Sequence, residues 1–352
     1  MRPLRVWGSV LVVTAAFAAG GICRARASTE AQAVSARPDA IHLKWSLSDP
    51  EGLAVASGDL FVANYESNSV TEVTVASGKL VRVLSGSTYH FDEPKALAVS
   101  GKHLFVANYA GSAVTEVSTA TGKLVRVIRG SASGISDPRS LAIQGSDLFV
   151  DNYGGNTVSE INTATGKVVR VLSARAFDFD AVYAVAANSK DLFVANYAGN
   201  SVTEVGVSSG KLVRVVSGSL YGFNGPEDLV ASNSDVFVVN ILGNSVTEAA
   251  GASGDLVRVL SGIPYELAMP EVAMLSGPDL FVANDAANAL TEVSAATGDF
   301  VRIISGSSYR FEYPIAFALS GPDLFVANLD GDSVTEIATA TGQLVRVISG
   351  SA

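Results

Sequence analysis

The sequence predicts an all-β chain folded as a seven-bladed β-propeller, with four antiparallel strands in each blade. A Phe-Val-x-Asn unit recurs at a constant spacing of 44 residues, beginning at Phe61, Phe105, Phe149, Phe193, Phe237, Phe281 and Phe325. Each repeat divides into short segments of alternating pattern, rich in Val, Thr, Phe and Leu. Four short strands in a repeat of roughly 40–50 residues are typical of a propeller blade.

The second repeat shows the four strands expected in every blade. They are predicted at 96–100, 103–109, 114–118 and 124–128. The loop 119–123 joins the last two strands, and its Gly122 stands where a hairpin of this length needs a positive φ. Gly occupies that position in all seven repeats. Helical solenoids of similar period are excluded, because none of these segments has a 3.6-residue apolar spacing.

Ring closure is expected without exchange of strands between the termini. Residues 42–50 align with the loop that precedes the first strand of each later repeat. The first repeat therefore starts with its own first strand, and the seventh ends with its own fourth. We expect the first and seventh blades to close the ring by packing face to face.

Composition excludes several classes of protein. The chain has 352 residues, a net charge of -10, 48% hydrophobic and 16% charged residues, which excludes intrinsic disorder. Its acidity argues against nucleic acid and anionic membrane surfaces as partners. A single Cys excludes a disulfide framework and a Cys-rich zinc site.

The first 27 residues are predicted to be an export signal. Arg2 and Arg5 precede a short apolar run at 10–19, and a small-x-small pattern at 25–27 predicts cleavage before Ser28. An uncleaved anchor is the alternative, and Ile22 directly before Cys23 fits a lipidation site poorly. We expect a secreted or extracytoplasmic protein without a later transmembrane segment.

The domain organisation expected from these patterns is simple. It consists of a signal peptide at 1–27, a linker at 28–44 and a propeller at 45–352. We also expect a monomer.

The repeats resemble a known family. The units FVANYAGSAVTEVSTATGKLVRVI (105–128) and FVANYAGNSVTEVGVSSGKLVRVV (193–216) look like the YVTN-type β-propeller repeat, and more distantly they are similar to the NHL repeat. NHL repeats usually carry Asp where this chain has Asn64 and Asn108. The resemblance covers about 45–352 and implies the fold, but propellers host enzymes, receptors and scaffolds, so it implies little about function.

Polar residues that recur in every blade are predicted to be structural. A Glu in the third strand is followed ten residues later by an Arg in the fourth, at 72 and 82, 116 and 126, 160 and 170, 204 and 214, 248 and 258, 292 and 302, and 336 and 346. We expect seven cross-strand ion pairs; a polar ring that binds a partner is the less favoured alternative. The repeated Asn is expected to bond its own hairpin, with contact to a ligand as the alternative. The repeated Phe is expected to fill the space between blades.

Residues that differ between repeats are the candidates for function. The residue after the repeat Pro is Glu51, Lys95, Arg139, Tyr183, Glu227, Glu271 or Ile315, and the residue after the repeat Asn is Tyr in four blades, then Ile241, Asp285 and Leu329. Both positions belong to loops expected around one mouth of the channel. The predicted ligand-binding residues are Tyr65, Lys95, Tyr109, Arg139, Asp151, Tyr153, Tyr197, Glu227 and Glu271. The alternative is a solvated rim whose sequence drifts.

A metal site and an enzymatic reaction are weaker hypotheses. Glu227, Asp228, Glu271 and Asp285 form an acidic group that could bind Ca²⁺. No catalytic residue is assigned, because the histidines at 42, 90 and 103 have no metal-ligand spacing and no nucleophile or phosphate motif is present. The prediction is a non-catalytic binding module for a protein, a peptide or a small polar ligand. The alternative is a metal-dependent lyase or lactone hydrolase with a carboxylate site at the channel mouth.

Overall fold

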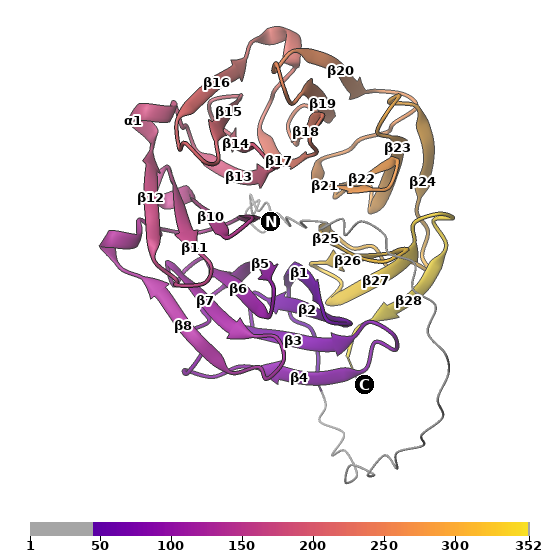
Figure 1. Ribbon diagram of the computed structural model, residues 1–352. Helices are drawn as coiled ribbons and strands as arrows, with labels where there is room; N and C mark the ends of the chain where they lie inside the picture. The colour runs from indigo at the N-terminus through magenta and orange to yellow at the C-terminus, as the bar shows by residue number, and fades with distance from the viewer. Residues whose placement is uncertain (1–44, 351–352) are drawn as a thin grey trace, which may run out of the picture.

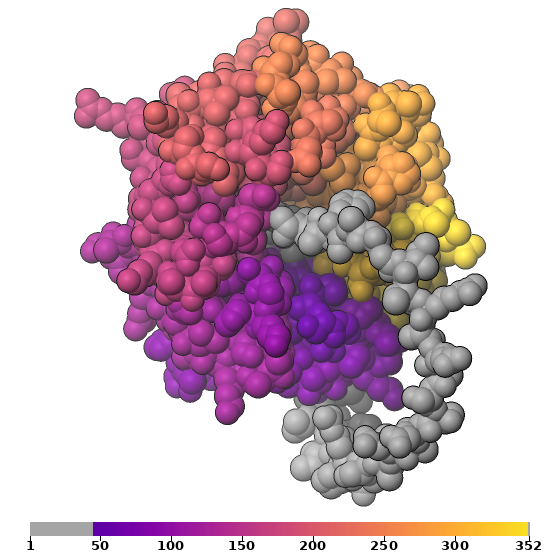
Figure 2. Space-filling view, in the orientation of Figure 1, coloured from indigo at the N-terminus to yellow at the C-terminus, as the bar shows by residue number. Residues whose placement is uncertain are grey.

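The computed structural model describes residues 45–350, and these form seven four-stranded sheets arranged radially around a central axis (Figure 1). In each sheet the strands pair antiparallel in chain order, so the blades are built from consecutive residues. Figure 2 shows the blades following one another around the ring as successive sectors of colour. The predicted fold and strand number are confirmed.

The innermost strands carry the residues that face the axis. They are β1 (Pro50–Ala56), β5 (Pro94–Ser100), β9 (Leu141–Gln144), β13 (Val182–Ala187), β17 (Pro226–Ala231), β21 (Pro270–Ser276) and β25 (Pro314–Ser320). The second strands are β2 (Asp59–Asn64), β6 (His103–Asn108), β10 (Asp147–Asn152), β14 (Asp191–Asn196), β18 (Asp235–Asn240), β22 (Asp279–Asn284) and β26 (Asp323–Asn328).

The third and fourth strands complete each blade toward the periphery. The third strands are β3 (Ser69–Thr74), β7 (Ala113–Ser118), β11 (Thr157–Asn162), β15 (Ser201–Gly206), β19 (Ser245–Ala250), β23 (Ala289–Ser294) and β27 (Ser333–Ala338). The fourth are β4 (Leu80–Leu84), β8 (Leu124–Arg129), β12 (Val168–Ser173), β16 (Leu212–Ser217), β20 (Leu256–Ser261), β24 (Phe300–Ile304) and β28 (Leu344–Ile348). A short helix, α1 (Ala174–Phe177), follows β12. Within 45–350, no helix is long and apolar enough to cross a bilayer.

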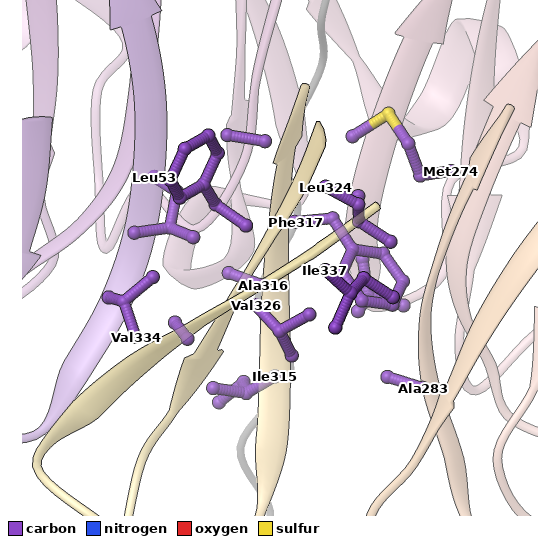
Figure 3. Close-up of a cluster of buried hydrophobic side chains, with 14 of the residues drawn as sticks. Leu53, Met274, Ala283, Ile315, Ala316, Phe317, Leu324, Val326, Val334 and Ile337 are labelled. Atoms are coloured by element: carbon purple, nitrogen blue, oxygen red, sulfur yellow. The ribbon is translucent and has the colours of Figure 1, made fainter. Parts of the chain in front are cut away.

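The core lies between the blades, where the repeated Phe residues are buried as predicted. Around the last blade, Phe317 and Phe325 pack with Leu53 from the first blade and Met274 from the sixth (Figure 3). One apolar cluster therefore spans three blades and includes the junction between the first and the last. The predicted closure by face-to-face packing, without strand exchange, is confirmed.

The repeated Glu and Arg form the predicted ion pairs, and each Arg also reaches the next blade. Arg258 Nε lies 2.9 Å from Glu248 Oε2, and its Nη2 donates to the backbone oxygen of Ala296, 3.0 Å away. At the closure, Arg346 Nη2 donates in the same way to the oxygen of Val75, at 3.0 Å. The carboxylates are buried, and burial raises the pKa of Glu248 although Arg258 lowers it. These pairs are braces between blades as well as links between strands.

The Gly of the outer hairpin leaves room for the arginine of the preceding blade. Gly122 has φ 68°, a left-handed conformation that non-Gly residues rarely adopt. A Cβ placed on it would lie 2.9 Å from the Cδ of Arg82, the arginine of the preceding blade. The turn and the close approach of the arginine therefore both require Gly here.

Replacing one bracing arginine should destabilise the ring locally. Arg258→Ala is expected to lower the free energy of unfolding by about 1–3 kcal/mol, because it leaves the buried Glu248 carboxylate without its ion-pair partner. Arg129→Ala, at the exposed end of β8, is the matched control and should stay within about 0.5 kcal/mol of wild type. Urea unfolding measures both, and equal effects would contradict the bracing role.

A second set of contacts joins each blade to the next near the mouth of the channel. The residue before the repeat Pro has a φ between 46° and 61° in every blade, and its backbone N–H is held by a side chain from the preceding blade in six of them. Asp332 Oδ1 accepts this bond from Asp49 N across the closure, at 2.9 Å. Between the third and fourth blades, Asn156 Oδ1 accepts instead from the N–H of Val182, the residue after the position that donates in the other blades. The first and last blades are thus joined by the same chemistry as any other pair.

Candidate functional site

One residue of each innermost strand, or of its lead-in, forms a ring of side chains around the axis. It is the residue after the repeat Pro. In six blades the pairing with the second strand shifts register there, as at Pro50 and Gly52, so the residue between them is bulged. We call this set the axial ring: Glu51, Lys95, Arg139, Tyr183, Glu227, Glu271 and Ile315. All seven are at most 3% exposed.

Electrostatic contacts between distant blades show that these side chains converge on the axis. Lys95 and Glu227 stand on the second and fifth blades, and each changes the pKa of the other. Lys95 also lowers the pKa of Glu271 on the sixth blade. Side chains on nearly opposite blades can interact in this way only across the centre of the ring, which the innermost strands surround (Figure 1).

The basic half of the axial ring lies on the second and third blades. The Lys95 ammonium forms a buried ion pair with the Glu51 carboxylate and lies 5.7 Å from the centre of the Tyr65 ring. Burial lowers the pKa of Lys95, while Glu51 raises it. The Arg139 guanidinium lies over the Tyr183 ring at 3.7 Å and near Tyr153. Aromatic faces stabilise a cation held this way.

The tyrosines around Arg139 form one connected group. Tyr183 stacks on Tyr197 with ring centres 4.9 Å apart, and it meets Tyr153 edge to face at 5.7 Å. The Arg139 guanidinium also lies 5.9 Å from the centre of the Tyr109 ring. The structure thus places Tyr109, Tyr153 and Tyr197 around Arg139, and Tyr183 joins them.

The acidic half lies on the fifth and sixth blades. Burial raises the pKa of Glu227 to about 7, although Arg139 and Lys95 lower it. Burial also raises the pKa of Glu271 well above its ordinary value, and the negative charges of Glu227 and Asp285 raise it further. The Tyr313 hydroxyl donates to Glu271 Oε1 at 3.3 Å.

Buried carboxylate oxygens in this half lack regular hydrogen bonds. Among the described residues, no partner of regular geometry meets Glu227 Oε1, Glu227 Oε2 or Glu271 Oε2. The Tyr183 hydroxyl also lacks one, although as a neighbouring donor it lowers the pKa of Glu227. Buried polar groups are normally paired, and an unpaired one costs about 1–3 kcal/mol.

Two of the predicted site residues have structural roles instead. Asp228 Oδ2 accepts a bond of 2.8 Å from the Ala273 N–H of the next blade, so it does not stand with the acids of the channel. The bulge explains this, because Glu227 occupies the bulged position and Asp228 resumes the strand one residue later. Ser140, at the equivalent position, accepts from Val185 N in the same way. Asp228 is therefore an inter-blade contact.

Asp151 is likewise turned to the backbone. Its Oδ1 accepts bonds from the N–H groups of Arg139 and Ser140, at the point where β9 begins later than the other innermost strands. Burial raises the pKa of Asp151 to about 7, and the two backbone bonds lower it. These bonds position the backbone that carries Arg139, while Asp151 Oδ2 is buried without a regular hydrogen bond, and the ligand contact of Asp151 stays a prediction.

An acidic hollow lies at the lip of the sixth and seventh blades. It has a volume of about 330 Å³ and is lined by Asp285, Ala286, Asn288, Glu312, Tyr313 and Asp330. Burial and the nearby Asp330 raise the pKa of Asp285 to about 6. Tyr313 belongs both to this hollow and to the hydrogen bond with Glu271, so the hollow adjoins the acidic half.

The predicted metal set is not assembled. In the part of the chain that the structure describes, no three His, Cys, Asp or Glu side chains are grouped closely enough to hold a metal ion. Ca²⁺ takes six to eight oxygen ligands. Of Glu227, Asp228, Glu271 and Asp285, the structure couples Glu271 to Glu227 and Asp285, and it directs Asp228 between the blades.

Comparison of the repeat positions also finds residues that the predicted set omits. Glu51, Tyr183 and Ile315 occupy the same variable position as Lys95 and Arg139, and that shared register was the available signal. Tyr65, by contrast, was predicted and lies beside Lys95, while its hydroxyl donates to Glu93. Tyr313 stands just before the repeat Pro, where the residue type also varies.

The repeated Asn and the histidines lie outside this site. Asn64 is fully buried and its Nδ2 donates to Thr71 Oγ1 at 2.9 Å, so it holds its own hairpin as predicted. His103 Nδ1 lies 2.8 Å from Glu116 Oε1, in the outer ion pair of the second blade. His90 is exposed in a loop, and His42 is outside the described residues.

Comparisons with known proteins extend the fold assignment. No protein-family model matches the chain, and no curated protein matches its sequence. Among solved structures, a streptogramin B lyase has a TM-score of 0.69 at 13% identity, covering 84% of this chain and 95% of that one. Virginiamycin B lyase from Staphylococcus aureus has a TM-score of 0.67 at 15% identity, over 83% and 97%. The hydrazine synthase of Kuenenia stuttgartiensis has a TM-score of 0.67 at 19% identity, over 85% and 98%.

These likenesses show the fold and no more, because all the identities are below 20%. A histidine-to-alanine variant of the virginiamycin B lyase, solved with quinupristin, is described as catalytically inactive. Within 45–350 of the present chain, the two histidines lie outside the axial ring. The class defined here is a seven-bladed propeller with a buried, charge-divided axial ring.

Proposed function

We propose that this protein is an exported, non-catalytic binding module that holds its ligand at the channel mouth, against the axial ring. One observation carries the proposal. The blades repeat one another closely, yet the position that meets at the axis holds three acids, two bases, a tyrosine and one isoleucine. Chemistry that differs from blade to blade at a shared centre suits a ligand without sevenfold symmetry.

Stability alone does not account for these residues. Buried charges are expensive to desolvate, and replacing them by apolar residues of similar size is often neutral or stabilising. Ile315 occupies the same position fully buried, so an apolar side chain fits there. A ring kept polar against this energetic preference is consistent with recognition of a polar ligand.

The test uses a variant that we expect to be more stable than wild type. Glu227→Leu removes a buried carboxylate with no regular hydrogen bond, and it should raise the free energy of unfolding by about 1–3 kcal/mol. Small molecules from a metabolite library that raise the melting temperature of wild type should no longer do so in Glu227→Leu. Loss of binding in a more stable protein cannot be attributed to unfolding.

Glu66→Gln is the control, since Glu66 is exposed in the first turn after a repeat Asn and belongs to the first blade, whereas Glu227 belongs to the fifth. It should keep both the stability and the ligand responses of wild type. If hits persist unchanged in Glu227→Leu, or if that variant is markedly less stable, the proposal is wrong.

A lyase or lactone hydrolase is the second candidate. Two observations favour it: the similar structures include streptogramin and virginiamycin B lyases, and a carboxyl group with a pKa of about 7 can exchange protons near neutral pH. Incubation with quinupristin, with and without Mg²⁺ or Ca²⁺, followed by liquid chromatography and fragmentation mass spectrometry separates the two, because elimination gives an isomer of unchanged mass and hydrolysis adds one water. Ring opening by wild type that is lost in Glu227→Gln would replace the binding proposal with this one.

Export is part of the proposal and rests on the leader at 1–27, which lies outside the described residues. The mature protein is proposed to begin at Ser28 and to act as an extracytoplasmic monomer without nucleic-acid partners. Intact-mass measurement of the exported protein, together with its size in solution, tests these points.

A further inference from the structure

We propose that the ligand is an organic monocation, a primary ammonium or guanidinium group on an apolar body, whose charged head binds between Glu227 and Glu271. This inference rests on the proposed function and specifies the ligand class of the same site. It is carried by the charge balance of the axial ring, by the unpaired buried oxygens, and by the surfaces on either side of them.

The charge balance indicates a single positive charge. When ionised, Glu51, Glu227 and Glu271 oppose Lys95 and Arg139, which leaves the axial ring one positive charge short of neutrality. Lys95 is ion-paired with Glu51, and the Arg139 charge acts on Glu227. One negative charge of the Glu227 and Glu271 pair therefore remains uncompensated, and a bound monocation would neutralise it.

The unpaired oxygens indicate a cation that donates hydrogen bonds. Both oxygens of Glu227 and Oε2 of Glu271 lack regular partners among the described residues, although both side chains are fully buried. An ammonium or guanidinium group supplies several N–H donors at once, and such charge-assisted bonds are the strongest available to a carboxylate. A divalent metal fits less well, because no three metal-ligating side chains in 45–350 are grouped closely enough.

The two flanks of the acid pair differ, and they orient the ligand. Toward the seventh blade is the acidic hollow, which Asp285, Glu312 and Asp330 line without a basic residue, so that it attracts a cation. Toward the fourth blade, Tyr197 and Leu242 meet over Gly225, whose Cβ position lies 3.2 Å from the Tyr197 ring and 2.9 Å from Leu242 Cγ. Leu242 is 56% exposed, so its apolar surface is open at the lip. The apolar body of the ligand is assigned to this side.

Tyr197 adjoins the acid pair through Tyr183, on which it stacks with ring centres 4.9 Å apart and whose hydroxyl acts on Glu227. The negative charges of Glu227 and Glu271 raise the pKa of Tyr197, after the larger effect of burial. The face of a tyrosine ring attracts cations, and its edge packs against apolar groups. A cation held by the two carboxylates would thus lie beside an aromatic face.

The experiment compares three probes of one shape. Benzylammonium, benzyl alcohol and benzoate share a ring and differ in charge, and CaCl₂ supplies a divalent metal without an organic body. We expect benzylammonium alone to raise the melting temperature and to give saturable heats in titration calorimetry. Glu271→Gln and Glu227→Gln should each weaken its binding at least tenfold, while Glu66→Gln should leave the affinity within twofold.

The pH dependence of that affinity adds an independent readout. The charged and titratable groups that interact electrostatically with the acid pair are Arg139, Lys95, Tyr183, Tyr197, Tyr313, Asp285 and Asp228. A carboxyl group with a pKa of about 7 is mostly protonated at pH 6 and mostly ionised at pH 8. Binding of a cation should therefore strengthen by roughly tenfold from pH 6 to pH 8, and this rise should shrink in Glu227→Gln.

The remaining outcomes overturn the inference in distinguishable ways. A response to benzoate that disappears in Arg139→Lys would place the ligand charge on the basic half and leave the proposed function standing. A response to CaCl₂ abolished by Glu271→Gln would show a metal site. If no probe acts on wild type, or if benzylammonium binds Glu271→Gln as tightly as wild type, the monocation assignment is wrong, and the library experiment with Glu227→Leu decides the proposed function separately.

Discussion

Replacing Lys95 by methionine should lower the free energy of unfolding by about 3–5 kcal/mol. Lys95 is fully buried, and its ammonium is ion-paired with Glu51, which is itself buried. Methionine keeps most of the volume of the side chain and removes its charge, so the carboxylate remains in the interior without that partner. Removing one member of a buried pair has an effect of this size because the other charge remains desolvated.

The double variant separates the charge from the packing. Lys95→Met/Glu51→Leu removes both charges, and it should recover most of the stability lost in Lys95→Met alone. Denaturant unfolding of wild type, the two single variants and the double variant gives the coupling energy of the pair. If the double variant is destabilised by the sum of the two single effects, the ion pair contributes no coupling and the account of the basic half is wrong.

Acidification from pH 8 to pH 5 should stabilise the folded protein by several kcal/mol, in contrast to the behaviour of proteins whose carboxylates are stabilised as anions. Burial is the largest influence on the carboxyl groups concerned, and it raises their pKa values in spite of nearby cations. The pKa reaches about 7 for Asp151, Glu204 and Glu227 and about 6 for Asp285. It is also raised for Glu271, Asp228 and the other recurring outer glutamates: Glu72, Glu116, Glu160, Glu248, Glu292 and Glu336.

The sign follows from the protons bound in each state. An unfolded Asp gives up its proton near pH 3.8, whereas the folded Asp151 keeps its proton until about pH 7. Between these values the folded state binds more protons, so stability falls as pH rises through that window. The contribution is fully present below the unfolded pKa and is lost above about 7. For Asp151, which is fully buried, the part of this contribution that is lost between pH 5 and pH 8 is on the order of 3 kcal/mol.

Free energies of unfolding at pH 5, 6, 7 and 8 test this. Asp151→Asn keeps an oxygen that can accept the Arg139 and Ser140 backbone bonds but removes the titration. Its stability should therefore change less with pH than that of wild type. A wild-type protein that is most stable at pH 8, or a variant with the same slope, would show that these carboxyl groups are not kept protonated by burial.

The fold could be predicted because the same pattern of four strands recurs seven times in the sequence. A constant period of 44 residues, with Gly122 and its equivalents in each outer hairpin, leaves little freedom in strand number or order. The ion pairs of Glu116 and Arg126 followed from the same register. The repeat did not indicate that each arginine also binds a carbonyl of the next blade, because that contact depends on the angle between blades rather than on spacing along the chain.

The site was predictable by position but not by side-chain direction. Lys95, Arg139, Glu227 and Glu271 were found because they break the repeat at a position that the fold places near the axis. Asp228 differs from its repeat equivalents in the same way. Because Glu227 is bulged, however, the Asp228 side chain is directed between the fifth and sixth blades instead of toward the axis. No residue pattern in a single strand reports such a bulge. Burial of the acids, and hence their raised pKa values, likewise depends on seven strands meeting at one axis.

The seam between Asp332 and Asp49 has a consequence for how the ring is ordered along the chain. The same kind of bond joins neighbouring blades elsewhere. Near the C-terminal end, a Cβ added to Gly350 would clash with the backbone oxygen of Trp45, so the two ends of the described chain lie against each other. Apart from the break in covalent continuity, this junction is equivalent to the others. The order of the blades around the ring therefore does not depend on which blade comes first in the chain. A circular permutant with its ends between any two neighbouring blades would present the same axial ring in the same cyclic order.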